Sequence, residues 1–67
     1  MQISARNQLR AKIDGIKNGP VSTEVTLSVG GQKMVSVITT ESATNLGLQV
    51  GDDVSAIVKA SNVMLMK

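Results

Sequence analysis

The residues of this chain that could bind a ligand lie near its two ends. Ser4 and Arg6 come at the start, where alternation along a strand would place both on one face. Lys59 and Ser61 come near the end. Hydroxyls, backbone N–H groups at irregular turns and cations all donate hydrogen bonds, a set that suits a small, fully ionised oxyanion. Each charge-assisted bond to such an anion contributes roughly 1.5–3 kcal/mol.

The stretch around the first pair has an unusual composition. Five consecutive small or polar residues, Ser4–Gln8, lie between Ile3 and Leu9. A strand that only fills a core would carry apolar residues at alternate positions here. The residue types leave two interpretations open: a binding segment, or the ordinary exposed surface of an edge strand.

The composition argues against catalysis and against a bound metal ion. The chain has no His and no Cys, so it lacks the base and the thiol of nucleophilic triads. Asp52 and Asp53 are adjacent in a predicted turn, and neighbouring strand residues point to opposite faces. The carboxylates lack the spacing of a metal-binding loop. The methionines Met34, Met64 and Met66 are expected to fill the core rather than to bind a soft metal.

Charge and aromatic content limit the choice of partner. The formal net charge is +2, and the excess lies at the front, in Arg6, Arg10, Lys12 and Lys17. That excess is small for a nucleic-acid-binding module, and the chain has no aromatic side chain on which bases could stack. No apolar run reaches the roughly 18 residues of a membrane span, and no signal-peptide segment follows the first Met. We therefore expect no nucleic-acid partner, no membrane association and a cytoplasmic location.

The length predicts one domain, residues 1–67, that associates with itself. A domain of this size buries only about 60% of the surface that its unfolded chain exposes. Small domains usually compensate with disulfides, a metal or partner subunits. The first two are excluded here, so self-association remains.

The hydrophobic pattern predicts five short strands and one helix. Period-two alternation is clear around Leu9–Asp14 and clearest over Val21–Val29. The predicted strands are 9–14, 21–29, 33–39, 54–60 and 63–66. Gly30-Gly31 suits a two-residue hairpin turn, and a threonine at the start of Thr39–Gly47 can cap a short helix that Gly47 ends. The predicted fold is all-β: a small five-stranded barrel of the oligonucleotide/oligosaccharide-binding type, with one short helix between the third and fourth strands.

Three segments resemble a known family. They are Ser4-Ala5-Arg6-Asn7-Gln8-Leu9, Thr39-Thr40-Glu41-Ser42 before Leu46-Gly47-Leu48, and Val58-Lys59-Ala60-Ser61-Asn62-Val63-Met64. In this order they resemble the molbindins, or molybdenum-pterin-binding proteins, which consist of a single TOBE-type domain. The resemblance covers nearly the whole chain, and the Ser-Ala-Arg-Asn-Gln run is its specific part.

The resemblance implies a function and a set of site residues. Molbindins are cytoplasmic stores of molybdate and tungstate, and they assemble as hexamers, trimers of dimers, with anion sites between subunits. Carried over to this chain, the site comprises hydroxyls, charges and backbone N–H groups of Ser4, Ala5, Arg6, Lys59, Ala60 and Ser61. No other cofactor is implied, and a pterin would lack an aromatic partner for stacking.

Two other functions stay open. One is a small nucleic-acid-binding barrel that uses the front cations against phosphates. The other is a molybdate-sensing domain that acts through a separate partner. For the oxyanion itself, a site made only of donors disfavours phosphate, which carries a proton near neutral pH. Preference for molybdate over sulfate is an expectation from the resemblance alone.

Overall fold

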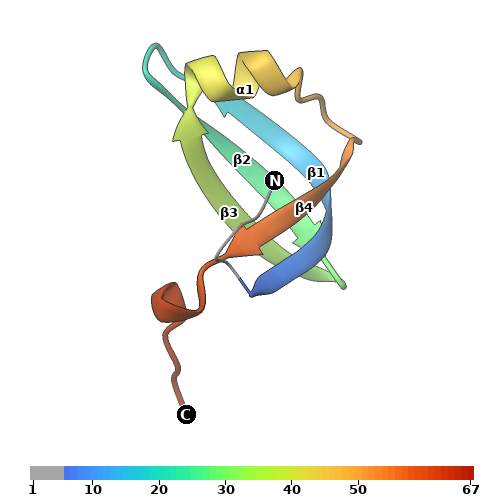
Figure 1. The fold of residues 1–67 in the computed structure, drawn as a ribbon. Helices are drawn as coiled ribbons and strands as arrows, with labels where there is room; N and C mark the ends of the chain where they lie inside the picture. Colours follow the sequence, from blue (N-terminus) through green and yellow to red (C-terminus); the bar gives the residue numbers. More distant parts are fainter. Residues whose placement is uncertain (1–5) are drawn as a thin grey trace.

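Six elements follow one another along residues 6–67, the part of the chain that the computed structural model describes. They are β1 (Asn7–Asn18), β2 (Ser22–Val29), β3 (Gln32–Thr39), α1 (Thr40–Leu46), β4 (Asp53–Val58) and the 3-10 helix η1 (Ala60–Asn62). The strands form one antiparallel sheet in the order β3-β2-β1-β4. The sheet curls on itself, and α1 lies across one of its ends (Figure 1). The predicted all-β class, with one short helix between the third and fourth strands, is confirmed.

The long strand β1 belongs to two pairings. Residues 7–12 pair with β4, and residues 12–18 pair with β2. The register with β2 shifts between Ile13 and Gly15, which marks a bulge. Because a bulge bends and twists its strand, one continuous strand can serve two walls of the barrel. β1 is longer than the predicted strand 9–14 and continues to Asn18.

The β2–β3 hairpin closes as predicted. Gly30 and Gly31 have φ angles of 54° and 83°, and the flanking residues Val29 and Gln32 are paired. A two-residue turn with positive φ at both positions matches the twist of the strands that it joins, and glycine adopts it without steric cost.

Helix α1 also begins and ends as predicted. The Thr39 hydroxyl accepts a hydrogen bond from the Ser42 backbone N–H at 3.0 Å. At the other end Gly47 has φ 62°, and the N–H groups of Gly47 and Leu48 donate to the carbonyls of Thr44 and Ala43. These two bonds form a Schellman motif, which satisfies carbonyls that the helix itself leaves free.

Replacing the cap residue should destabilise the fold modestly. Thr39→Ala removes the acceptor for the Ser42 N–H, and lost caps of this kind cost about 0.5–2 kcal/mol. For a domain of this size each kcal/mol lowers the thermal midpoint by about 4–8 °C. Thr39→Ser keeps the hydroxyl and should stay near the parent. Circular dichroism melts at equal protomer concentration measure both, and equal midpoints for the two variants would show that the cap contributes nothing.

The core is small and aliphatic. Its central buried cluster comes from the inward faces of β1 and β2 and consists of Ala11, Ile13, Val25 and Leu27. Side chains of β3, β4 and the segment after α1 pack against them and are only partly buried. Thr23 is fully buried as well, and its hydroxyl contacts the Thr40 hydroxyl at 2.9 Å and Asn18 Oδ1 at 3.2 Å. The Thr40 hydroxyl in turn donates to the Gly19 carbonyl at 2.7 Å, so this cluster fixes the start of α1 to the end of β1.

The predicted fifth strand is wrong for this chain taken alone. Residues 60–62 form η1, and residues 63–67 after it have no regular secondary structure. A strand needs a neighbour with which to exchange backbone hydrogen bonds, and this segment runs away from the sheet (Figure 1). The core role expected for Met64 and Met66 is wrong for the same reason, whereas Met34 packs against the core.

The turn before β4 ties the chain back to β1. The Asp52 carboxylate accepts a hydrogen bond from the Gln49 N–H at 2.9 Å, and Gly51 has φ 95°. The Gly51 N–H donates to the Ile13 carbonyl at 2.8 Å, and the Ile13 N–H donates to the Asp52 carbonyl at 3.0 Å. Asp52 therefore has a structural role in this turn. No helix within residues 6–67 is long and apolar enough to cross a membrane.

Candidate functional site

The start of β1 and the end of β4 meet at one end of the barrel. Asn7 and Val58 are directly opposite each other in the antiparallel pairing. The next residues outward are Arg6 on one strand and Lys59 on the other, so continuing the register by one position sets these two cations across from each other. Both side chains are exposed. The pairing therefore brings together residues from opposite ends of the sequence, within one chain.

The backbone after β4 turns so that the first N–H groups of the turn have no backbone acceptor within residues 6–67. Lys59 is extended and stands at the N-cap of η1, with no side chain capping that helix. The bonds of this turn come from the N–H groups of Asn62 and Val63, which donate to the carbonyls of Lys59 and Ala60 at 2.9 and 3.3 Å. The first N–H groups of any helix have no acceptor within it. In η1 these belong to Ala60 and Ser61, the residues that the molbindin resemblance assigns to the site.

Four of the six predicted site residues thus lie together at this end. They are Arg6, Lys59, Ala60 and Ser61, and all of them are exposed. The other two, Ser4 and Ala5, lie outside the residues that the structure describes. The proposed binding geometry of the whole set remains a prediction.

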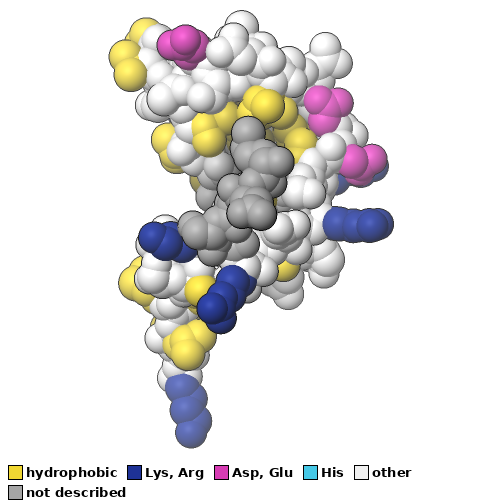
Figure 2. All heavy atoms as spheres, in the orientation of Figure 1, with side chains coloured by type: hydrophobic (Ala, Val, Ile, Leu, Met, Phe, Trp, Pro, Cys, Tyr) yellow, Lys and Arg dark blue, Asp and Glu magenta, His cyan; other side chains and the backbone are white. Residues whose placement is uncertain are grey.

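Acidic residues are missing from both ends of the chain. The first acidic residue is Asp14 and the last is Asp53. Because the start of β1 and the end of β4 that meet here come from before Asp14 and after Asp53, these two segments supply cations without carboxylates. On the face drawn in Figure 2, the acidic side chains lie in the upper part. In the part toward the C-terminal residues, the charged side chains that are visible are all basic. The local field at this end therefore favours an anion.

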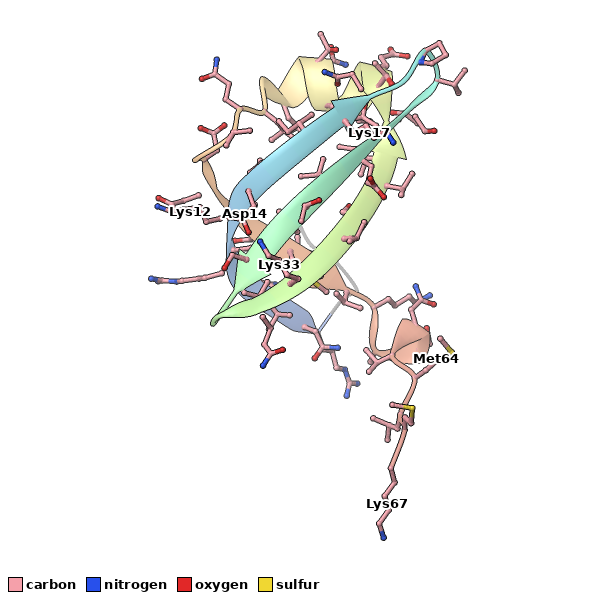
Figure 3. All side chains as sticks on the ribbon, turned by 180° about the vertical axis from the view of Figure 1, so that it is seen from behind. Lys12, Asp14, Lys17, Lys33, Met64 and Lys67 are labelled. Carbon is pink, nitrogen blue, oxygen red and sulfur yellow. The ribbon has the colours of Figure 1, made fainter. Side chains whose placement is uncertain are left out.

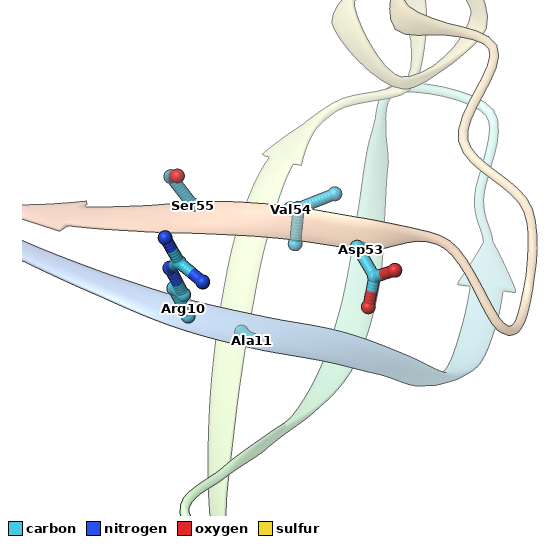
Figure 4. A pocket seen from close by; sticks show the side chains of 5 residues that line it. All are labelled: Arg10, Ala11, Asp53, Val54 and Ser55. Atoms are coloured by element: carbon cyan, nitrogen blue, oxygen red, sulfur yellow. The ribbon is translucent and has the colours of Figure 1, made fainter.

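A groove on the wall of the barrel offers a second combination of cation and hydroxyl. It has a volume of about 440 Å³ and is lined by Arg10, Ala11, Asp53, Val54 and Ser55. Arg10 and Ser55 are strand partners, and Figure 4 shows the guanidinium directed toward Ser55. Sequence reasoning missed this pair because nothing local indicates which β4 residue faces Arg10. The Asp53 carboxylate opposes an anion here, so the groove is the weaker candidate.

The basic residues of the first part of the chain, from Arg6 to Lys17, do not form one continuous patch. Lys12 lies 3.8 Å from the Asp53 carboxylate, and Lys17 lies near the opposite end of β1 (Figure 3). On the same outer surface Lys33 contacts Asp14 at 2.6 Å. Nucleic-acid binding relies on a basic stripe that follows a phosphate backbone. Carboxylates interrupt such a stripe here.

Residues 6–67 contain no group of three or more His, Cys, Asp and Glu that could hold a metal ion. The polar groups that Arg6, Lys59, Ala60 and Ser61 bring to this end of the barrel are a guanidinium, an ammonium, backbone N–H groups and a hydroxyl, all of which can donate hydrogen bonds. Donors of this kind bind oxygen atoms of an anion rather than a bare cation.

The comparisons with known proteins point to the same kind of ligand. The family profile described as the TOBE domain matches residues 3–65. The chain is 45% identical to molybdenum-pterin-binding protein 2 of Clostridium pasteurianum over 67 residues, covering 98% of each. A solved molybdate-binding protein from Sporomusa ovata is 37% identical and covers 100% of both chains with a TM-score of 0.95. The cytoplasmic molybdate-binding protein ModG, in a form with molybdate bound, is 39% identical over 97% of this chain and 53% of its own, with a TM-score of 0.84.

Proposed function

This chain belongs to the TOBE domain family, as a protein of the molbindin type, and on that premise we propose that it binds molybdate or tungstate as free oxyanions. The proposed site comprises Ser4, Ala5 and Arg6 from the start of the chain, with Lys59, Ala60 and Ser61 from its end. The observation that carries the proposal is the β1–β4 register, which supports an opposed Arg6–Lys59 pair at a barrel end without acidic residues.

The donors suit a tetrahedral dianion in number and in charge. Two cations balance two negative charges, and the small residues Ala5 and Ala60 allow backbone N–H groups to approach the oxygens closely. A protonated oxygen on phosphate would find an acceptor only in a hydroxyl of Ser4 or Ser61, since the guanidinium, ammonium and N–H groups can only donate, so phosphate is disfavoured. Sulfate has the same charge and shape as molybdate. Selection between the two anions therefore depends on the size of the cavity.

The bound species is the oxyanion without a pterin. Some relatives carry pterin in their names, but a flat ring system is held in proteins largely by stacking, and this chain has no aromatic side chain. The protein as proposed performs no chemistry on its ligand. Its role is to store molybdenum inside the cytoplasm and to release it again.

Residues 1–67 act in this proposal as one domain that assembles into a homohexamer, a trimer of dimers, with anion sites at subunit contacts. The limited core supports such assembly, because association buries the apolar surface that a domain of this size leaves exposed. A hexamer of 7.0 kDa chains has a mass near 42 kDa, which light scattering distinguishes from a monomer or a dimer.

Calorimetric titration tests the ligand directly. Molybdate and tungstate should each give a saturable binding isotherm, and phosphate at the same concentration and ionic strength should give none. The protein has no His and no Cys, the side chains that most often titrate near neutral pH, so the contribution of its side chains to affinity should be constant between about pH 6 and 8. Absence of binding by both molybdate and tungstate would refute the proposed function, whatever the assembly state.

A further inference from the structure

An asparagine is followed by a glycine at the end of β1, where the chain turns toward β2. Asn18 is exposed and Gly19 is half-buried. Among the four asparagines of the sequence, only Asn18 precedes a glycine. Asparagine is a chemically labile residue, and its side-chain amide is lost fastest before glycine, because no side chain hinders the backbone nitrogen that attacks it.

The fold requires glycine at position 19. A Cβ atom built there would lie 2.6 Å from the Ser22 carbonyl oxygen, which is too close for two atoms that are not bonded. The same oxygen accepts a hydrogen bond from the Gly19 N–H at 3.0 Å. A larger residue would have to open this turn. The labile pair is therefore a consequence of the close approach between the backbone at Gly19 and the backbone at Ser22.

Hydrogen bonds hold both groups that would react. The hydroxyl of the fully buried Thr23 donates to Asn18 Oδ1 at 3.2 Å, and Asn18 and Thr23 are opposite each other in the β1–β2 pairing. The Thr40 hydroxyl lies 2.9 Å from that of Thr23 and donates to the Gly19 carbonyl at 2.7 Å. We call these four residues, Asn18, Gly19, Thr23 and Thr40, the turn cluster. It holds the side chain that would be attacked and the peptide group that would attack it.

We propose that Asn18 is a site of spontaneous deamidation and that the turn cluster limits the rate of this modification. The Gly19 nitrogen loses its proton and attacks Asn18 Cγ. A bond forms between these two atoms, the bond from Cγ to Nδ2 breaks, and ammonia leaves. Water, the only co-reactant, then opens the cyclic succinimide at either of its carbonyls, which gives aspartate or isoaspartate at position 18.

Ring closure needs a movement that the turn cluster opposes. Asn18 is the last residue of an extended strand, and the Gly19 nitrogen reaches Cγ only after the backbone rotates out of that conformation. The Ser22 carbonyl also holds the proton that the nitrogen must lose. Deamidation therefore proceeds from molecules in which this end of β1 has opened, and its rate measures how often that happens.

The modification changes this end of the barrel and leaves the candidate oxyanion site in place. Either product adds one negative charge, which lowers the formal net charge from +2 to +1. Isoaspartate also lengthens the backbone by a methylene group, so position 18 no longer fits its register with Thr23. Lys17, the preceding residue, lies near the end of β1 opposite to Arg6 (Figure 3). Molybdate affinity should therefore stay unchanged, and the inference is independent of the proposed function.

The test follows the full chain at mildly alkaline pH by intact mass spectrometry and peptide mapping. The native parent should accumulate aspartate and isoaspartate at position 18 before it loses any amide at Asn7, Asn45 or Asn62. The same chain unfolded in urea should deamidate at Asn18 about tenfold faster or more. Thr23→Val removes the hydroxyl and keeps the shape, and it should raise the native rate about 3- to 10-fold, as expected for one lost hydrogen bond.

Two further variants make the test specific for the turn cluster. Ile13→Val is the control for a general loss of stability, because it shortens a core side chain and leaves the cluster intact. Urea titration gives the unfolded fraction of each variant. After correction for that fraction, Ile13→Val should deamidate at the parent rate and Thr23→Val above it. Thr40→Val removes the bond to the Gly19 carbonyl, should also exceed the parent rate, and carries the test if Thr23→Val does not fold.

Three results would overturn the proposal. One is an unfolded chain that deamidates no faster at Asn18 than at Asn45, and another is a native parent that deamidates as fast as the unfolded chain. The third is a rate for the cluster variants that does not exceed that of Ile13→Val after correction. A rate for Thr23→Val below that of the parent belongs with this third result, since it would show that the hydroxyl activates the amide rather than protecting it.

Discussion

Arg6→Ala should weaken molybdate binding by more than tenfold while the barrel stays folded. Arg6 lies outside the core, its side chain is exposed, and it stands one position beyond the last pair of the β1–β4 ladder. Removing it takes away a forked donor and one of the two charges that balance the dianion. A charge-assisted hydrogen bond contributes roughly 1.5–3 kcal/mol, which corresponds to a loss of about 10- to 150-fold in affinity. Calorimetry at fixed ionic strength measures the change.

Arg10→Ala is the matched control for that experiment. Both residues are arginines of the same strand region, so each substitution lowers the net charge by the same amount and alters the long-range field similarly. Arg10, however, lies in the wall groove beside Asp53. Affinity should change less than threefold or so, because only the diffuse field is lost. Equal losses for Arg6→Ala and Arg10→Ala would show that binding depends on overall charge and that the barrel-end site is wrong.

Ile13→Ala should destabilise the protein enough to leave a measurable unfolded fraction at room temperature. Ile13 is 1% exposed and lies at the bulge, where β1 passes from one pairing to the other. Truncating a buried isoleucine costs about 2–5 kcal/mol through lost burial and the cavity left behind. Domains have only about 5–15 kcal/mol of stability in total, and small ones lie at the lower end. Urea titration followed by far-UV circular dichroism gives the free energy of unfolding.

Val21→Ala shows what the same kind of truncation does outside the core. Val21 is 75% exposed, so its removal should change the free energy of unfolding by less than about 0.5 kcal/mol. Molybdate should raise the midpoints of both proteins, since it binds only the folded state. A loss below about 1 kcal/mol for Ile13→Ala would mean that the four buried aliphatic residues are not the stabilising core.

The sequence predicted correctly those turns, caps and strand faces that depend on residues close together in the chain. The alternation around Val25 and Leu27, the Gly30-Gly31 turn and the Thr39 and Gly47 caps each depend on residues a few positions apart. All of them are confirmed by the structure. The inward and outward faces of these strands follow from the pattern, because successive side chains of a strand point to opposite faces of the sheet.

Long-range pairing explains what the sequence could not predict. The first residues of β1 pair with β4 from the other end of the chain, and no neighbouring residue indicates that partner. Residues 63–66 have the composition of a strand, but strand formation needs an open edge within reach, and their own sheet does not supply one. For the candidate site, residue types suggested donors for an oxyanion. The register was needed to show that the strand ends next to Arg6 and Lys59, at Asn7 and Val58, lie opposite each other.

The two-part pairing of β1 also determines when the barrel end can form during folding. The β2–β3 hairpin and the second half of β1 join nearby segments, whereas pairing of Asn7 with Val58 closes a loop that contains most of the chain. Loop closure of this length costs more entropy and is expected to follow the local contacts. The proposed site, which needs Arg6 and Lys59 near each other, can form only after that late step. An anion in the proposed site cannot guide the early stages of folding, and its effect on the kinetics should appear as slower unfolding of the finished barrel.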